Sequence, residues 1–240
     1  MSSPLFARQS SLLAYLTSGD AIFGRQTGLP APLSGIDTGL LRLEARFSYE
    51  KRVAKIAAVL PRTLALLGEE DPSLFPDFAD SHPPETLASL ANARQFVDYL
   101  KARWRMQKPE PAYLPDVAAY EIAWSEVRTE EDALAKPRPM ATAGGAVRRA
   151  ANLVLLRLDH DVRPLFEGEP SALPAARETL IAVAMTAGAE TPLTAELQPA
   201  VFDLLSRIGS FTDVAALGDI PRLEEMIVTL AAHGLVELSE

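Results

Sequence analysis

Apolar residues recur at three- and four-residue intervals through the first 135 residues, which is the period of an amphipathic helix. Turn residues separate four such stripes, which lie at residues 5–16, 53–67, 90–104 and 114–124. Within the second stripe, Pro61 must kink or divide the helix, and Gly68 suits its end. The pattern predicts an all-α bundle in the first part of the chain.

The pattern changes after a segment rich in turn residues, which contains Pro137, Pro139, Gly144 and Gly145. We therefore predict two domains, over residues 1–140 and 141–240. In the second domain, the short apolar runs LVLLRL, VRPLF and TLIAVAMT predict three strands. The sequence GLVEL near the end predicts a further small strand.

Three helices are predicted after the strands, at residues 197–208, 213–217 and 221–233. Pro221 suits the first turn of the last helix and Gly234 suits its end, while Gly218 allows a tight turn before it. Strands followed by three such helices match a winged helix-turn-helix. The expected fold class is α+β, with an N-terminal all-α helical bundle followed by a small winged-helix-like domain of about three strands and three helices.

The charge is concentrated in the second predicted domain. Residues 1–140 contain 16 Lys and Arg against 18 Asp and Glu, a net charge of −2, whereas residues 141–240 contain 7 against 14, a net charge of −7. An acidic surface repels a phosphate backbone, whose attraction to Lys and Arg supplies most non-specific nucleic-acid affinity. Nucleic acid is therefore not an expected partner of the second domain.

The composition also limits the expected cellular location of the chain and the kinds of chemical site it can form. No apolar run is long enough to cross a bilayer, and the N-terminus lacks a basic region followed by an apolar stretch, so neither a membrane span nor an export signal is predicted. The absence of cysteine excludes disulfides, thiolate metal sites and cysteine nucleophiles, and it fits a reducing compartment. The expected location is the cytoplasm.

No constellation of catalytic residues is recognisable. The three histidines, His82, His160 and His233, stand far apart and have no short metal-ligand spacing. The sequence also lacks a glycine-rich phosphate-binding motif. We therefore predict no catalytic, cofactor-binding or metal-binding residue in this chain.

Glu121 is the one carboxylate that stands on an apolar helical face, between Val117 and Trp124. An unpaired charge in that position would be costly, so Glu121 needs a partner. We predict a structural ion pair with Arg46 or Arg52. A role as general acid or base is the alternative, but no second catalytic group can be placed beside it.

Residues 60–124 resemble the HvfC/BufC family, which often carries the label of a DNA-binding domain. The similarity lies in LPRTLALLGEEDPSLFPDFADSHPP, in FVDYLKARW and in AYLPDVAAYEIAWSEV. YLPDVAAYEIAW, with His82-Pro83-Pro84 upstream, is its most specific part. Tyr120 and the pair Lys51-Arg52 depart from the family pattern.

The resemblance implies a partner role. Proteins of the MbnC/TglI type in this family accompany a TIM-barrel, iron-dependent oxidase that modifies a cysteine-containing, ribosomally made precursor peptide. By analogy, this chain would be a non-catalytic adaptor whose helical domain packs on the oxidase and whose winged-helix-like domain captures the leader peptide. The iron and the chemistry would belong to the oxidase, so no cofactor is expected here.

We predict that residues 179–186 form a sheet-edge strand to which the peptide adds, because the segment is apolar and lacks the charges that usually protect an edge. The last long helix would help to hold the peptide. The expected contacts are Thr179, Leu180, Ile181, Ala182, Val183, Ala184, Met185, Leu223, Met226, Ile227 and Leu230. The sequence equally allows a central strand or an internal helix at this segment.

Two other functions stay open. A winged-helix DNA-binding regulator would use residues 221–233 as its recognition helix, although there Arg222 is the only strongly basic residue and faces Glu224 and Glu225. An enzyme with an unrecognised site is the third hypothesis, although catalysis needs convergent groups that the sequence does not reveal.

Overall fold

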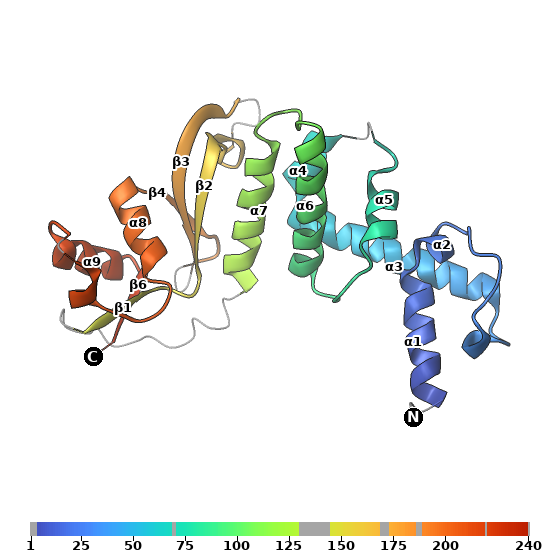
Figure 1. The fold of residues 1–240 in the computed structure, drawn as a ribbon. Coiled ribbons are helices and arrows are strands. Elements are labelled where there is room, and N and C mark those ends of the chain that lie inside the picture. The colour runs from blue at the N-terminus through green and yellow to red at the C-terminus, as the bar shows by residue number, and fades with distance from the viewer. Residues whose placement is uncertain are drawn as a thin grey trace. The chain divides into compact units, whose positions relative to one another are not determined.

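The computed structural model describes residues 4–68, 71–129, 145–168, 173–185, 189–218 and 220–239. Its contacts divide the chain into two compact units, Met1–Leu114 and Pro115–Glu240 (Figure 1). The sequence predicts the boundary between residues 140 and 141, and residues 130–144, on which that prediction rests, lie outside the described residues. The two boundaries differ because the helix predicted at residues 114–124 belongs to the second unit and not to the bundle.

The first unit is helical, as the apolar spacing predicts. Its helices are α1 (Pro4–Thr17), α2 (Gly19–Ile22), η1 (Ala31–Leu33), α3 (Thr38–Val59), α4 (Pro61–Leu67), α5 (Leu74–Ser81) and α6 (Ser89–Met106). Pro61 divides α3 from α4, because a proline inside a helix removes a backbone donor. Gly68 ends α4 with a φ of 64°, a conformation that favours glycine.

The core of the first unit lies between α3, α5 and α6. Phe78 of α5 and Phe96 of α6 are fully buried, and their rings meet edge to face with centroids 5.1 Å apart. A second apolar cluster joins α1, α2, η1 and the first half of α3, where Tyr15, Ala21 and Leu33 are buried. The two clusters fix α3 along its length.

The second unit contains α7 (Leu114–Thr129) from its second residue onward and an antiparallel sheet of order β2-β3-β4. These strands are Leu153–Asp161, Ala175–Ala184 and Leu193–Glu196. Tyr120 and Trp124 of α7 reach one face of the sheet at Thr194. On the other face, Ala182 and Ala184 share a core with Leu204 and Leu205 of α8 (Pro199–Arg207), so the sheet lies between α7 and α8 (Figure 1).

The rest of the second unit has a winged-helix-like arrangement. A second antiparallel sheet has the order β5-β1-β6, formed by Thr212–Asp213, Ala146–Arg149 and Val236–Ser239. It packs with α8, η4 (Val214–Leu217) and α9 (Leu223–Ala232) around one apolar core. The middle strand, β1, comes from the start of the domain. The predicted α+β fold class is confirmed.

Most elements predicted for the second domain form close to their predicted bounds, but two predictions are wrong. VRPLF is not a strand, because its central residues form the 3₁₀ helix η3 (Arg163–Leu165), in which Pro164 has no N–H for a strand ladder. The last helix begins at Leu223 rather than at Pro221. Arg222, the N-cap residue, has a left-handed backbone conformation with a φ of 58°, so the helix cannot extend through it to Pro221.

Candidate functional site

The segment predicted to accept a peptide forms a strand, but not an edge strand. Residues 179–184 lie in β3, which pairs with β2 on one side and with β4 on the other. The prediction of an edge at residues 179–186 is therefore wrong, and Thr186 itself lies outside the described residues. The apolar run without charges has a different cause, because a central strand covered on both faces is apolar at every position rather than at alternate ones.

The predicted contact residues are mostly core residues. Thr179, Leu180, Ile181, Ala182, Val183, Ala184 and Met185 are all at least 93% buried, as their exposed fractions range from 0% to 7%. Leu223, Ile227 and Leu230 of α9 point into the same core, and Met226 packs against it partly buried. A role for them as direct peptide contacts stays a prediction, and for the buried residues among them such a contact would require core side chains to be displaced.

The edge of this sheet on the β4 side is formed by residues outside the predicted contacts. Leu197 N–H donates to Leu180 C=O at 2.8 Å, and Glu196 lies opposite Ile181. Because antiparallel neighbours alternate between bonded and non-bonded pairs, Leu193 and Ala195 direct their backbone groups at β3. The N–H and C=O groups of Thr194 and Glu196 therefore point away from the sheet.

Aromatic side chains of α7 hold β4 in place. The hydroxyl groups of Tyr120 and Thr194 are 2.9 Å apart, and Trp124 Nε1–H donates to the Thr194 hydroxyl at 3.4 Å. Tyr120 is only 2% exposed, and its ring lies 4.5 Å from that of Phe166. Burial raises the pKa of the Tyr120 phenol, so the group stays a neutral hydrogen-bonding anchor.

An ion-pair network holds the other end of β4. Arg163 bonds Asp161 at 2.7 Å and also contacts Glu196, while Arg177 bonds Glu196 and Asp161, both at 2.6 Å. The hydrogen bonds from Arg177 and Arg163 lower the pKa of the Glu196 carboxyl to about 2. Two guanidinium groups and two carboxylates thus tie β2, η3, β3 and β4 together.

The opposite edge of the sheet is covered at one point by α7. Asp116 accepts a hydrogen bond from the backbone N–H of His160 at 3.0 Å, and it also contacts His160 Nδ1 at 2.8 Å. This contact falls where the pairing of β2 with β3 shifts register between Leu158 and His160. The Asp116 carboxylate therefore accepts the backbone N–H next to this irregularity, and peptide addition at this part of β2 is blocked.

Glu121 is buried, as predicted, with 4% of its surface exposed. Its pairing with Arg46 or Arg52 stays a prediction. Arg46 forms an exposed ion pair with Glu50 at 3.0 Å, one helical turn further along α3.

Arg52 occupies a buried site of its own in the first unit. Its guanidinium donates to Asn92 Oδ1 at 2.8 Å, to His82 C=O at 2.7 Å and to Gln95 Oε1, and it lies 4.4 Å from the centre of the Phe78 ring. Burial lowers the pKa of this group to about 10. The carbonyl group of His82, which begins the sequence His-Pro-Pro, is therefore a structural acceptor for Arg52.

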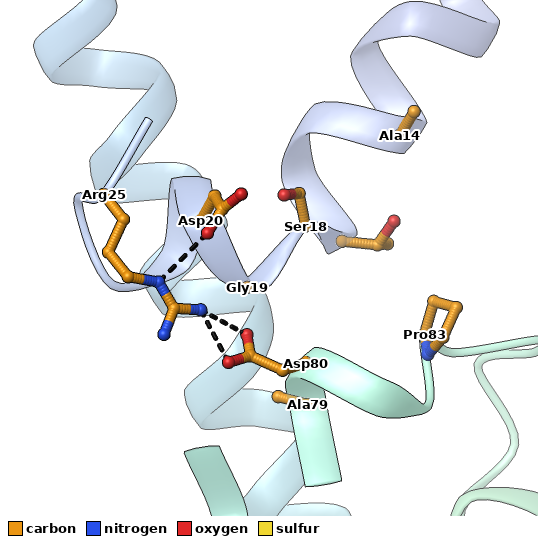
Figure 2. A pocket seen from close by; sticks show the side chains of 9 residues that line it. Ala14, Ser18, Gly19, Asp20, Arg25, Ala79, Asp80 and Pro83 are labelled. Atoms are coloured by element: carbon orange, nitrogen blue, oxygen red, sulfur yellow. Dashed lines mark hydrogen bonds and ion pairs between the residues drawn. The ribbon is translucent and has the colours of Figure 1, made fainter. Parts of the chain in front are cut away.

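A polar depression of about 710 Å³ lies where α1, α2 and α5 meet (Figure 2). Arg25 spans it, bonding Asp20 at 3.0 Å and both carboxylate oxygens of Asp80 at 2.5 and 2.6 Å. A Cβ atom at Gly19 would lie 1.4 Å from Asp80 Oδ1, so only glycine allows this carboxylate to approach. The charged groups of the depression, Arg25, Asp20 and Asp80, are paired with one another, which indicates a structural joint.

The start of α9 is acidic and self-paired. Arg222 bonds Glu225 through Nε at 2.7 Å and through Nη2 at 2.9 Å. A depression of about 630 Å³ beside it is lined by Asp213, Arg222, Glu224 and Glu225 together with apolar residues. The basic side chain of the predicted recognition helix is thus bound to a neighbouring carboxylate.

The described residues contain no group of three His, Cys, Asp or Glu side chains placed to hold a metal ion. In the described ranges, no helix is both long and apolar enough to cross a bilayer.

Comparison with known proteins shows a similarity to a described family. A family described as SCO6045-like, C-terminal domain, matches residues 6–102, which lie within the first unit. The chain matches no curated protein. The chain is therefore similar to that family over its helical part, and its resemblance to the HvfC/BufC family stays a prediction.

Proposed function

We propose that this chain is a non-catalytic adaptor that binds a precursor peptide and a TIM-barrel, iron-dependent oxidase during maturation of a ribosomally made peptide. The observation that carries the proposal is the charge of the two compact units. Met1–Leu114 contains 13 Lys and Arg against 12 Asp and Glu, a net charge of +1, whereas Pro115–Glu240 contains 10 against 20, a net charge of −10. One unit is thus nearly neutral and the other strongly acidic.

The acidic unit is suited to a cationic polypeptide. Summed charge raises the local concentration of partners of opposite sign and speeds their association. The same charge repels nucleic acid, whose affinity depends on neutralising phosphates with Lys and Arg. The leader of the precursor peptide is therefore assigned to the second unit.

The nearly neutral unit offers an apolar surface to a protein partner. Leu40, Leu43 and Phe47 follow one face of α3 and are 65%, 47% and 46% exposed. Contiguous exposed apolar side chains are typical of protein-binding surfaces. This stripe supports the assignment of the oxidase to the first unit, together with the resemblance to the HvfC/BufC family, whose members accompany such enzymes.

The alternative is a DNA-binding regulator, which the winged-helix-like arrangement of α8, η4, α9 and the β5-β1-β6 sheet favours. A groove-reading helix normally presents several donors to base edges. Here Glu224 and Glu225 stand in the first turn of α9, and Arg222 is paired with Glu225. These contacts support the adaptor over the regulator.

Co-purification tests the proposal. The tagged full chain is coexpressed with the TIM-barrel oxidase and the short cysteine-containing peptide encoded beside its gene. A stable complex of all three is expected, with iron only in the oxidase. The proposal fails if the neighbouring genes encode neither partner, or if both are made and neither is retained by the tagged chain.

A further inference from the structure

We infer that the loop between α5 and α6, residues 82–88, binds the depression at the start of α9 of a second copy of this chain. Leu87 of one copy enters the depression of the other, so the chain associates weakly with itself. The inference goes beyond the proposed function and does not depend on it. It rests on two surfaces of the described residues that are complementary in charge and in polarity.

The loop is fixed on the first unit at five of its seven carbonyl groups. Side chains of α3 and α6 donate to these groups, namely Arg52 to His82 at 2.7 Å, Gln95 to Pro83 at 3.1 Å, Asn92 to Thr86 at 2.9 Å and to Ala88 at 2.8 Å, and Lys55 to Leu87 at 2.6 Å. Two of these donors, Arg52 and Asn92, are buried. The loop therefore loses little conformational entropy when it binds a partner.

Leu87 projects from this fixed loop with 84% of its surface exposed. Single exposed leucines are common on protein surfaces, so exposure alone carries no argument. Here Lys55 holds the carbonyl group of Leu87 itself, and the side chain of Thr86 accepts the N–H of Ala88 at 3.2 Å. An apolar side chain is thus presented at a defined position, which is the preorganised form that favours binding.

The two cations beside the loop have no carboxylate partner among the described residues. Arg52 and Lys55 donate to carbonyl groups and to side-chain amides, none of which carries a charge. Glu85 is the one carboxylate within the loop. Because charges across an interface are complementary, a partner of Leu87 is expected to have an apolar pocket with carboxylates at its rim.

The second unit contains a pocket of this kind, with a volume of about 630 Å³, at the start of α9. Its lining includes the apolar residues Ile220 and Leu223 and the charged residues Asp213, Arg222, Glu224 and Glu225. Arg222 is paired with Glu225, whereas Glu224 forms no ion pair with another described residue. Glu224 is therefore free to meet a cation from a partner.

A second copy supplies both surfaces at once. In the contact, Leu87 leaves water and lies against Ile220 and Leu223, and Lys55 lies beside Glu224. Each chain has a net charge of −9, which opposes association at long range. At about 0.1 M salt, charges more than about 10 Å apart are largely screened, so the local attraction decides.

Sedimentation equilibrium of the full chain at about 0.1 M salt tests the inference. One loop in one depression makes a contact below the size of a standard interface, so the range should extend to about 1 mM protein. The average mass should rise above that of the monomer as the concentration increases. A mass that stays at the monomer value over the whole range overturns the inference.

Variants of each surface, with matched controls, locate the contact. Leu87→Asp brings a carboxylate to the acidic pocket and Glu224→Lys brings a cation to the loop, so each should weaken association at least about tenfold. Met106→Asp changes a residue of the first unit that is 90% exposed, and Asp203→Lys reverses an exposed charge on α8. Both controls lie outside the two surfaces and should associate within about threefold of wild type. Equal effects of variants and controls overturn the assignment.

Mixing the two weakened variants gives the sharpest result. Leu87→Asp keeps an intact depression and Glu224→Lys keeps an intact loop, so one functional contact can form between them. An equal mixture, with a fluorescent label on one variant, should form a heterodimer at concentrations where each variant alone is monomeric. A mixture that stays monomeric contradicts the pairing of these two surfaces. Thermal unfolding of each variant shows that it is folded.

Co-purification with the oxidase separates this inference from the proposed function. If Leu87→Asp loses the oxidase while the wild-type chain alone stays monomeric, the loop contacts the enzyme and self-association is wrong. If wild type retains neither the oxidase nor the peptide, the proposed function fails. Self-association is then still decided by sedimentation, because that measurement uses the chain alone.

Discussion

Among single residues, Arg52 should matter most to the stability of the first unit. It is 9% exposed and its donors satisfy Asn92, Gln95 and the carbonyl group of His82. Arg52→Ala leaves these acceptors without their charged donor in a buried site, so we expect a loss of about 3 kcal/mol in the free energy of unfolding. Arg46→Ala, which removes only an exposed helical ion pair, should cost about 0.5 kcal/mol. Urea unfolding of both variants measures the difference, and equal losses would contradict the assignment.

Glu196 gives the second unit a pH dependence of defined sign. Its pKa is lowered to about 2 by Arg177 and Arg163, so the carboxylate is stabilised in the folded chain relative to the unfolded one. That contribution is present above the ordinary glutamate pKa and is lost as the pH falls toward 2. Wild type should therefore be more stable than Glu196→Gln at pH 6, and the gap should close between about pH 4.5 and 2. A gap that stays constant over this range would show that the charge of Glu196 does not tie down β4.

The burial of Glu121 could be predicted from the sequence, whereas the hydrogen-bond partners of Arg52 could not. Helical spacing alone puts Glu121 on an apolar face, whereas the partners of Arg52 come from α6 and from the segment after α5, which are 30 to 43 positions away. The same limit applies to Thr194. Its anchors, Tyr120 and Trp124, lie 74 and 70 positions before it. Local patterns contain no information about such pairs.

At the level of elements, β3 and β4 should respond differently to proline. Ala182 and Val183 bond β4 and β2 respectively, so a proline at either position removes a ladder bond in a central, buried strand. We expect Val183→Pro to cost about 3 kcal/mol or more. Thr194→Pro removes an outward N–H and should cost much less than Val183→Pro, with Thr194→Val as the control for the lost hydroxyl. Thermal unfolding of the three variants is the measurement. Equal destabilisation by both prolines would contradict the observed strand order.

Elements with a regular period could be predicted, and those set by tertiary contacts could not. The helices α1, α4 and α6 and the last part of α3, from Val53 onward, follow from apolar spacing and from Pro61. VRPLF contains enough apolar residues to suggest a strand, but Arg163 bonds Asp161 two residues earlier and the chain turns into η3. TLIAVAMT has no alternation, and its place in the centre of the sheet depends on β4, which is short and weakly apolar. Strand order arises from pairing between distant segments, and the sequence of one strand does not specify it.

At the level of the whole molecule, the position of the boundary between the two units determines the net charge of each unit. Moving the boundary to Pro115 transfers residues 115–140, which contain six Asp and Glu against three Lys and Arg, to the second unit and sharpens the contrast between the units to +1 and −10. The period of α7 identifies a helix but does not reveal which surface its apolar face covers. The hydrogen bonds of Tyr120 and Trp124 to Thr194 give that answer.

The proposed function requires that the acidic unit binds a peptide and not nucleic acid. Fluorescence anisotropy with the full chain tests it, using the labelled precursor peptide encoded beside the gene and a labelled duplex of the gene's own promoter at physiological salt. The peptide should bind saturably and more weakly as salt rises, and the duplex should show no specific binding tighter than about 10⁻⁸ M, the weak end of the specific range. Tighter specific binding of the duplex, together with no binding of the precursor, would contradict the adaptor and establish a regulator.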